Sequence, residues 1–288
     1  MRVRYLLVIS EVDPVARRVA ATWGTPPATG DFVDAVPLRD LGDGVLELRR
    51  PGLHIHDENL DGRLPSAVRT ARPTLVFPSI HRSRENVNCL TVHALGNFGP
   101  TAEVGGRPRT LNPTDPRAMA NALRRLSEAA GPLGWSATYE ATHHGPELDL
   151  PSFFAEIGYG TALEPPEPVV RVLAQSVRTP VSDAADRIAL AVGGGHYAPH
   201  FTDLALRRHW AFGHIVSRHS LKLLDRTTAR AAFAAMSDAA GIVFARAADA
   251  ELPAFDGVGP RLRDSAADPI EPSAASMRST DASRSSGT

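Results

Sequence analysis

The sequence predicts an α/β fold: a single domain with a mixed, largely parallel sheet flanked by helices. Three observations support this prediction. Short apolar segments bounded by Gly, Pro or polar residues recur along the chain, which is typical of buried strands. Amphipathic segments with helix-start signals lie between several of them. Strands that alternate with helices favour parallel neighbours, because each crossover helix returns the chain to the same end of the sheet.

The elements follow in order from the N-terminus. Residues 4–10 are predicted to be a buried strand, and the amphipathic run 15–23 a helix. Further strands are predicted at 45–48, 74–78, 90–93, 136–140, 153–157 and 187–192. The clearest helices are predicted at 115–129, where Pro116 stands in the first turn, and at 167–177, after a proline pair.

Length and composition bound the kind of protein. A chain of 288 residues that is 43% hydrophobic can bury a core without disulfides. Its single cysteine, Cys89, excludes an internal disulfide and a Cys-rich zinc site, and fits a reducing cytoplasm. No apolar run approaches the roughly 18–20 residues that a membrane helix needs. We therefore expect a cytoplasmic protein without membrane association and without an obligatory protein partner.

Composition also divides the chain near its C-terminus. From about Asp264 it is rich in Ser, Ala, Asp and Pro and has almost no large apolar residue. Such a segment cannot bury enough apolar surface to offset the entropy of ordering. We expect residues 1–263 to form the folded domain and residues 264–288 to be a disordered tail.

The charge balance favours no particular partner. The formal net charge is −1, which by itself gives no argument for a polyanion. Arginine pairs such as Arg82 with Arg84, or Arg207 with Arg208, can still form a local phosphate-binding patch. The alternative for each pair is a solvated surface.

Two segments, 140–146 and 193–199, place histidine beside residues that fix an unusual backbone. In the second, three glycines allow positive φ, and Pro199 removes an N–H group. Both segments follow predicted strands, as does 79–83, and ligands bind beyond the carboxyl ends of strands in such sheets. We therefore expect histidines from three strand ends to meet in one cleft.

The chemistry of that cleft stays open at this level. A neutral imidazole can accept a proton from water or bind zinc, and Glu140 or Glu156 can orient the ring or complete a ligand set. Adjacent strand residues point to opposite faces, so His143 and His144 face one site only if a turn forms; one ring facing the cleft is the simpler expectation. The spacing matches no known zinc motif. Backbone N–H groups at the 193–195 turn can hold an anion, or the turn can be purely structural.

The remaining reactive residues are expected to have structural or surface roles. Cys89 lies in an apolar strand, where a buried inert thiol is much commoner than a nucleophile. For the histidines outside the strand ends we expect surface or structural roles. His54 and His56 alternate on a possible strand, and His214 and His219 follow a predicted bend at Gly213.

Six ordered segments resemble the motif series of D-aminoacyl-tRNA deacylases of the archaeal and plant type. They are 81–83, 90–93 with 96–99, 140–146, 156–158, 193–199 with 201–202, and 213–215. The resemblance runs from the first strand to about His214. It implies a fold similar to those of peptidyl-tRNA hydrolases and purine nucleoside phosphorylases. It also implies hydrolysis of the ester between a D-amino acid and tRNA, with zinc as cofactor.

Together with the resemblance, these arguments give a set of expected site residues. We expect catalytic roles for Glu140, Thr142, His143, His144 and His196. We expect substrate contacts from His81, Arg82, Ser83, His93, Asn97, Gly194, Gly195 and Tyr197. We expect His143, His144, His196 and Glu156 to be the zinc ligands.

Two features depart from the family pattern. His200 stands where the family usually carries Lys or Arg, and 159–164 lacks the Ser-Thr and acidic-Trp stretch associated with it. Two alternatives to this function are kept: a nucleoside phosphorylase or nucleosidase that binds phosphate at the glycine turn, and a non-catalytic tRNA-binding protein.

Overall fold

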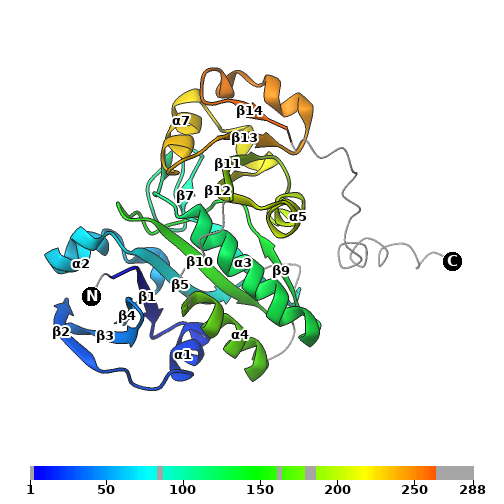
Figure 1. The fold of residues 1–288 in the computed structure, drawn as a ribbon. Helices are drawn as coiled ribbons and strands as arrows, with labels where there is room; N and C mark the ends of the chain where they lie inside the picture. The colour runs from blue at the N-terminus through cyan, green and yellow to red at the C-terminus, as the bar shows by residue number, and fades with distance from the viewer. Residues whose placement is uncertain (1–2, 83–86, 161–163, 179–185, 264–288) are drawn as a thin grey trace.

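The larger of two layers is a mixed sheet that crosses the lower half of the molecule in Figure 1. The computed structural model describes residues 3–82, 87–160, 164–178 and 186–263. Within these, the sheet has eight strands in the order β2-β3-β4-β1-β5-β10-β6-β9. They span Tyr5–Ser10 (β1), Ala28–Val33 (β2), Val36–Gly42 (β3), Val45–Arg50 (β4), Thr74–His81 (β5), Cys89–Ala94 (β6), Ser136–Tyr139 (β9) and Ser152–Gly158 (β10).

The central strands of this sheet run parallel. β4, β1, β5 and β10 are parallel neighbours, while β6 is antiparallel to β10 and parallel to β9. β2, β3 and β4 form an antiparallel edge. The carboxyl ends of β1, β4, β5 and β10 therefore lie along one edge of the sheet.

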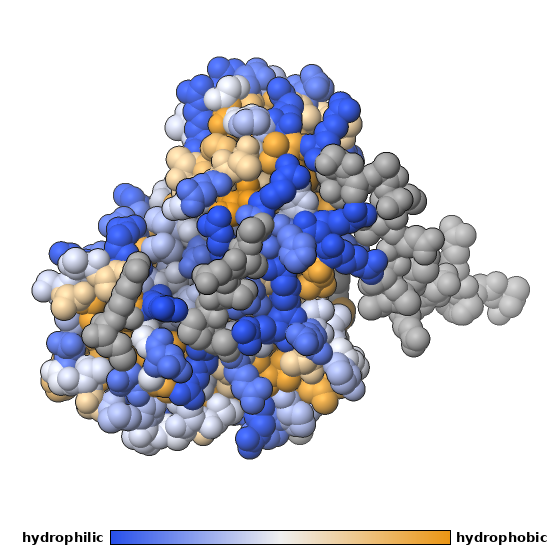
Figure 2. Space-filling model, viewed as in Figure 1, coloured by the Kyte–Doolittle hydropathy of each residue, from blue (hydrophilic) through white to orange (hydrophobic). Residues whose placement is uncertain are grey.

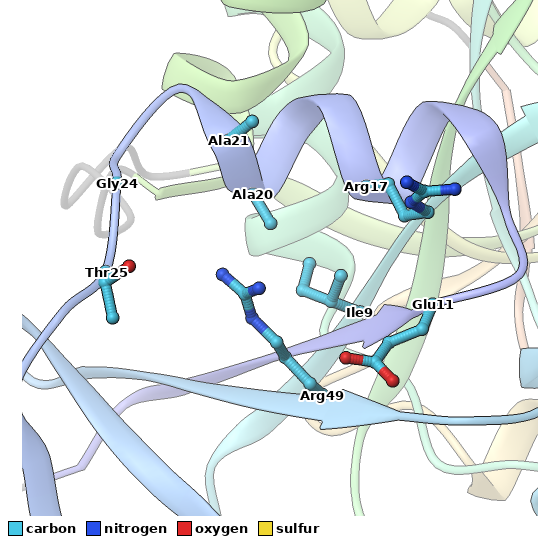
Figure 3. A pocket seen from close by; sticks show the side chains of 8 residues that line it. All are labelled: Ile9, Glu11, Arg17, Ala20, Ala21, Gly24, Thr25 and Arg49. Atoms are coloured by element: carbon cyan, nitrogen blue, oxygen red, sulfur yellow. The ribbon is translucent and has the colours of Figure 1, made fainter.

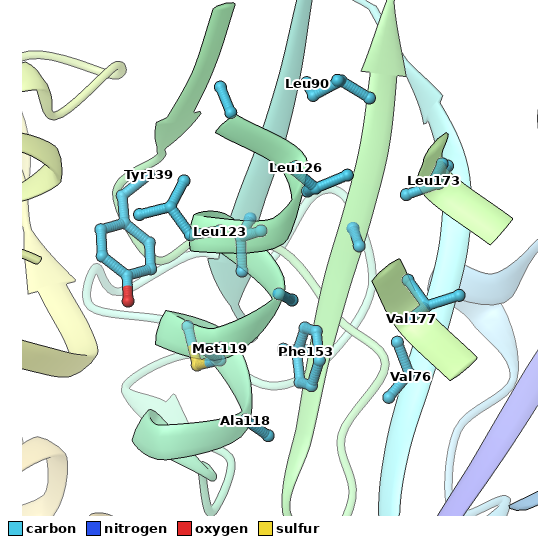
Figure 4. Close-up of a cluster of buried hydrophobic side chains, with 14 of the residues drawn as sticks. Val76, Leu90, Ala118, Met119, Leu123, Leu126, Tyr139, Phe153, Leu173 and Val177 are labelled. Carbon is cyan, nitrogen blue, oxygen red and sulfur yellow. The ribbon is translucent and has the colours of Figure 1, made fainter. Parts of the chain in front are cut away.

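Three helices pack on one face of the larger sheet. They span Pro14–Ala21 (α1), Pro116–Ala130 (α3) and Glu167–Arg178 (α4). α1 and α3 each begin with an aspartate cap followed by proline: Asp13 accepts from two backbone N–H groups of α1, and Asp115 from one of α3. Figure 4 shows α3 and α4 lying over the strands, with their apolar side chains directed at the sheet. Leu123, Leu173 and Phe153 are nearly or fully buried there, and burying such a side chain stabilises the fold by about 1.5–3 kcal/mol.

A second, smaller sheet lies above the first in Figure 1. Its four described strands are all parallel, in the order β12-β11-β13-β14. They span Arg187–Val192 (β11), Trp210–Val216 (β12), Gly241–Phe244 (β13) and Arg261–Leu262 (β14). Helices α5 (Pro199–Arg208) and α7 (Arg226–Ala234) pack on this sheet.

The two sheets share one core. Trp210, Phe212 and Ile215 of β12 belong to the same buried cluster as Leu123 of α3 and Leu90 of β6. Because apolar contacts continue from one sheet to the other, the chain forms a single α/β domain, as predicted.

Short elements complete the described part of the chain. They are α2 (Ser66–Ala71), α6 (Arg218–Leu221), the strand pair β7 (Gly96–Asn97) and β8 (Thr110–Leu111), and five 3₁₀ turns at His54–His56, Asp61–Arg63, Gly131–Leu133, Ala247–Glu251 and Pro253–Phe255. None of the described helices is both long and apolar enough to cross a membrane. On the face in Figure 2, hydrophilic residues are interspersed with smaller apolar areas.

All predicted strands and helices are present, with shifted ends, and a smaller sheet accompanies the predicted one. Two expectations about single segments were wrong. His54 and His56 form a 3₁₀ turn and not a strand. Gly213 lies inside β12 and makes no bend; a side chain there would stand 2.4 Å from Thr114 Oγ1 and 2.6 Å from Met236 Cγ. The glycine thus serves close packing. The predicted tail 264–288 lies outside the described residues.

Candidate functional site

Seven polar side chains from both sheets meet at the strand ends, in what we call the histidine–glutamate cluster. Its members are His81, His93, Glu140, His143, His144, Glu156 and His196. β5 and β10 pair so that Gly158 lies beside His81, and β10 and β6 pair so that Phe154 lies beside His93. The predicted convergence of three strand ends is confirmed.

Backbone contacts fix the segments that carry the cluster. Ala141 N–H donates to His196 O at 2.8 Å, which joins the segment after β9 to the segment after β11. Asp13 caps α1 with one carboxylate oxygen and accepts from Ser79 Oγ at 2.7 Å with the other. The end of β5, and with it His81, is therefore tied to the first helix.

Glu140 lies at the centre of the cluster and is only 1% exposed. Its Oε1 is 3.1 Å from His81 Nδ1, and its Oε2 is 3.5 Å from His196 Nε2. Neither oxygen has an aligned hydrogen-bond donor among the described residues. Burial raises the pKa of Glu140 to about 7, although His93 opposes the shift. Glu140 can therefore exchange a proton near neutral pH.

Glu156 behaves in the opposite way. Burial disfavours its charge, but the hydrogen bond with His81 and the nearby His93, whose Nε2 lies 3.8 Å away, outweigh burial and lower the pKa of Glu156 well below its usual range. Burial acts to lower the pKa values of His81 and His93, but the neighbouring carboxylates, Glu156 above all, outweigh it and raise both. One carboxylate is thus held ionised and the other is poised to titrate, a division that enzymes use to separate acid and base roles.

The segment 143–146 forms the predicted turn, and both histidines face the cluster. His144 has φ +44°, and the Gly145–Pro146 peptide bond is cis. The ring centroids of His143 and His144 lie 4.1 and 4.9 Å from that of His93. Both rings join the cluster because the turn cancels the alternation of a strand, and of the two only His143 also lines the adjoining cavity.

Hydrogen bonds select one tautomer for each of these three histidines. Nδ1 of His143 donates to Ala141 O at 2.8 Å, Nδ1 of His144 to Gly145 O at 2.7 Å, and Nδ1 of His93 to Ala94 O at 3.1 Å. A carbonyl oxygen only accepts, so each Nδ1 carries the proton and the neutral ring keeps a lone pair on Nε2. Burial and neighbouring histidines lower the pKa of His143, and that of His144 to about 4.

Three overlapping groups of described residues could hold a metal ion, with candidate atoms within 4.8 Å of one another. They are His93 with His143 and His144, His81 with Glu140 and His196, and His93 with Glu140 and Glu156. His93 Nε2 and both Glu140 oxygens are buried without a hydrogen-bond partner, a state that an ion can relieve. The donor set therefore fits a metal such as zinc.

The expected zinc ligands do not form one of these groups. His143 and His144 belong to the first group, His196 to the second and Glu156 to the third. His93 and Glu140, which the groups share, were expected to contact substrate and to catalyse. No local spacing indicates their central position, since it depends on strand register.

A cavity of about 490 Å³ opens beside the cluster, among the segments that follow β9, β11 and β12. It is lined by Ala141, Thr142, His143, Gly194, Gly195, His196, Ser217, Arg218, His219 and Ser220. Gly194 has φ +84°, and nothing lies within 4 Å of the place where a side chain would stand. A ligand can therefore approach this backbone closely. Sequence reasoning missed the lining residues 217–220, which follow β12.

A second cavity of about 260 Å³ lies on the other side of His81. It is lined by Arg82, which is exposed, by Tyr159, which is half-buried, and by Gly158, which is buried. The hydroxyl of Tyr197 lies 3.0 Å from His81 Nε2, so this tyrosine contacts the cluster. Ser83, a predicted substrate contact, lies outside the described residues.

Two other predicted residues are engaged at the edge of the site. The Asn97 amide donates to Gly105 O at 3.0 Å and so holds the loop that packs on Gly145. The Thr142 hydroxyl accepts from Ile215 N–H at 3.1 Å. Cys89 is buried in β6, as expected for a thiol without a catalytic role.

A cavity of about 590 Å³ lies apart from the cluster, beside α1 (Figure 3). Arg17 and Arg49 line it with Glu11, and Arg49 points into the open space. Arg49 is paired through Nε with the buried Glu47, so much of its charge is balanced. This cavity holds none of the expected site residues, and the cluster is the better candidate for chemistry.

Comparisons with known proteins agree with these motifs. The family model of D-aminoacyl-tRNA deacylases matches residues 69–251. The D-aminoacyl-tRNA deacylase of Thermoplasma acidophilum is 36% identical over 223 residues, which cover 77% of this chain and 82% of that protein. That of Methanoregula boonei is 47% identical over 161 residues, covering 54% of this chain and 36% of that protein.

A solved structure shares the fold. The crystal structure of a conserved protein of unknown function superposes with a TM-score of 0.72 at 26% sequence identity, covering 90% of this chain and 94% of that one. The matched residues 69–251 contain every member of the histidine–glutamate cluster. The chain belongs to the D-aminoacyl-tRNA deacylase family.

Proposed function

We propose that this protein is a zinc-dependent hydrolase that cleaves D-aminoacyl-tRNA into a free D-amino acid and tRNA. The observation that carries the proposal is the buried cluster around Glu140 and His93, which opens into a cavity of about 490 Å³. Family membership favours this reaction over a nucleoside phosphorylase and over a non-catalytic tRNA-binding protein. Hydrolysis of D-aminoacyl-tRNA removes misacylated tRNA before it reaches translation.

We assign the zinc to His93, His143 and His144. Their three Nε2 lone pairs match the three protein ligands of catalytic zinc sites, which keep one position open. Each ring also donates Nδ1–H to a backbone carbonyl, the outer support that orients metal-binding histidines. Zinc held by these residues would supply Lewis acidity and would lower the pKa of a water bound to it to roughly 7.

The chain's own residues carry the remaining steps. Glu140, with a pKa near 7 in the metal-free site, accepts the proton of the attacking water. His196, whose side chain is 49% exposed at the cavity, lies 3.5 Å from Glu140 and can pass the proton to the departing ribose oxygen. The N–H groups of Gly194 and Gly195 donate to no described residue, so they can stabilise the oxyanion of the ester carbon.

Substrate recognition is assigned to the cavity and its rims. Arg218 lines the larger cavity and Arg82 the smaller one, and neither forms an ion pair within the described residues. They are suited to the phosphates of the tRNA 3′ end, a salt-dependent contact. Preference for the D-amino acid would come from the shape of the cavity, which rejects the L-enantiomer rather than recognising a particular side chain.

Deacylation assays test the proposal. D-Tyr-tRNA and L-Tyr-tRNA are compared with and without chelator, for wild type and His143→Ala. His209→Ala is the matched control, because its side chain is 80% exposed and lies outside the cluster. We expect loss of D-Tyr-tRNA hydrolysis with chelator and in His143→Ala only. Equal hydrolysis of both enantiomers contradicts the chirality assignment, and chelator resistance contradicts the zinc assignment.

A further inference from the structure

His214 is a buried histidine that the proposed chemistry does not use. It lies in β12 with no exposed surface. Both ring nitrogens have partners: Nδ1 is 3.1 Å from Thr142 Oγ1, and Nε2 is 3.0 Å from Asn112 O. The ring thus connects the smaller sheet to two segments that border the cluster.

The direction of each hydrogen bond follows from the partners. Asn112 O can only accept, so Nε2 of His214 carries the proton. Burial lowers the pKa of His214 to about 4, so the ring is neutral near pH 7 and Nδ1 is an acceptor. The Thr142 hydroxyl therefore donates to Nδ1, and its own oxygen accepts from Ile215 N–H at 3.1 Å.

Both ends of the turn that carries His143 and His144 are held by this arrangement. Thr142 directly precedes the turn, and its N–H also donates to Ile215 O at 2.9 Å. At the other end, the Asn112 amide donates to Pro146 O at 2.9 Å. His214 is the side chain that joins the two anchors, Thr142 and Asn112.

We propose that His214 is a positioning residue that holds the His143–His144 turn in its active geometry through the hydroxyl of Thr142. This inference rests on the proposed function, because the turn supplies two of the assigned zinc ligands. If the ring only filled space in the core, it would stabilise β12, and activity would not depend on which of its nitrogens bonds Thr142. The two roles predict different results for substitutions that keep one nitrogen position each.

Asparagine and glutamine separate the two bonds. In His214→Asn the amide oxygen takes the place of Nδ1, so Thr142 keeps its acceptor while the bond to Asn112 is lost. In His214→Gln the amide takes the place of Nε2, so Asn112 keeps its donor while Thr142 loses its acceptor. Each variant removes one hydrogen bond from the same buried site, which makes them matched controls for stability.

Steady-state kinetics on D-Tyr-tRNA with the zinc-loaded protein give the test. We expect His214→Asn to keep kcat within about threefold, and His214→Gln to lower kcat by roughly 10- to 100-fold at similar KM, since small misplacements of reacting groups cost about this much. Thr142→Val should resemble His214→Gln, with little further loss in the double variant, while Thr142→Ser should retain activity. Equal kcat in the Asn and Gln variants, or losses that follow melting temperature alone, would overturn the proposal.

A second measurement does not depend on activity. In ¹⁵N spectra of imidazole-labelled protein, the signals absent from His214→Asn identify His214. We expect His214 to carry a proton on Nε2 and none on Nδ1 between about pH 5.5 and 8, because its ring is neutral in this range. A protonated Nδ1 on His214 refutes the proposed hydrogen bond from the Thr142 hydroxyl, even if the enzyme is active. If the wild type fails to hydrolyse D-aminoacyl-tRNA but His214 shows the expected tautomer, the proposed function is refuted. The hydrogen bonds of His214 with Thr142 and Asn112 are then still supported.

Discussion

Nδ1 of His81 lies 3.1 Å from Oε1 of Glu140, yet it forms its hydrogen bond with Glu156 at 3.2 Å. The ring of His81 therefore hydrogen-bonds Glu156 and only lies close to Glu140. This unequal sharing helps to hold Glu156 ionised, while burial raises the pKa of Glu140, which has no aligned donor, to about 7. The two glutamates are buried together but are prepared for different protonation states.

Removing the titratable group of Glu140 tests its role as the base. Glu140→Gln keeps the shape of the side chain but cannot accept a proton, so we expect kcat on D-Tyr-tRNA to fall by about 10²- to 10⁴-fold. Glu128→Gln, at an exposed position of α3, is the control and should match wild type. Activity of Glu140→Gln within about threefold of wild type would remove Glu140 from the mechanism.

The same substitution should stabilise the metal-free protein. The pKa of Glu140 is raised from 4.5 to about 7, so the fold favours the neutral form, and stability is lost as pH rises from about 4.5 through 7. The cost at pH 7.5 is up to about 3 kcal/mol. Glutamine stays neutral, so we expect a higher melting temperature for Glu140→Gln than for wild type at pH 7.5 with chelator.

The difference between the two melting temperatures should shrink at pH 5. For a chain of this size, each kcal/mol corresponds to roughly 2–4 °C. If Glu140→Gln melts below wild type at pH 7.5, the charge of Glu140 does not destabilise the metal-free protein, and the prediction is wrong.

Zinc should bind tightly only when His93 is present. His93→Ala removes one of the three Nε2 donors and should lower zinc affinity at least about 10²-fold, measured by competition with a chromophoric chelator. Zinc at 100 times its dissociation constant should stabilise wild type by about 2.7 kcal/mol. An unchanged zinc affinity in His93→Ala, with His209→Ala as control, would move the site to another group of the cluster.

The glycine turn should matter for turnover more than for stability. Gly194→Ala forces a side chain onto a backbone at φ +84°, which costs roughly 1 kcal/mol and shifts the N–H groups of the turn. We expect kcat to fall by about 10²- to 10³-fold if these groups hold the oxyanion. Gly30→Ala is matched, because Gly30 has φ +94° and equally open surroundings in the edge strand β2. It should lose stability and keep kcat.

The sequence predicts the part of the site that depends on strand ends. Segments 140–146 and 193–199 follow recognisable strands, so their convergence could be expected from the rule that ligands bind at carboxyl ends. His93 and Glu140 are different, because their central position depends on the register of β6, β9 and β10, which no local pattern encodes.

The role of Gly213 could not be predicted from the sequence either. Gly213 suggests a bend, since glycine most often serves backbone freedom, but in the structure it makes room for Thr114 and Met236 inside β12. The two uses look alike in sequence. The expected bend at Gly213 is also why β12 is absent from the predicted strands.

The cluster draws His81, His93 and Glu156 from the larger sheet and His196 from the smaller one. Neither sheet holds a complete site, so activity requires both to be docked. A brief separation of β11 and β12 from α3 would inactivate the enzyme while most of its secondary structure persisted. An ion held by His93, His143 and His144 would fix the turn that Thr142 bonds to Ile215 of β12. We therefore expect zinc to slow amide hydrogen exchange in β12 more than in the distant strands β2 and β3.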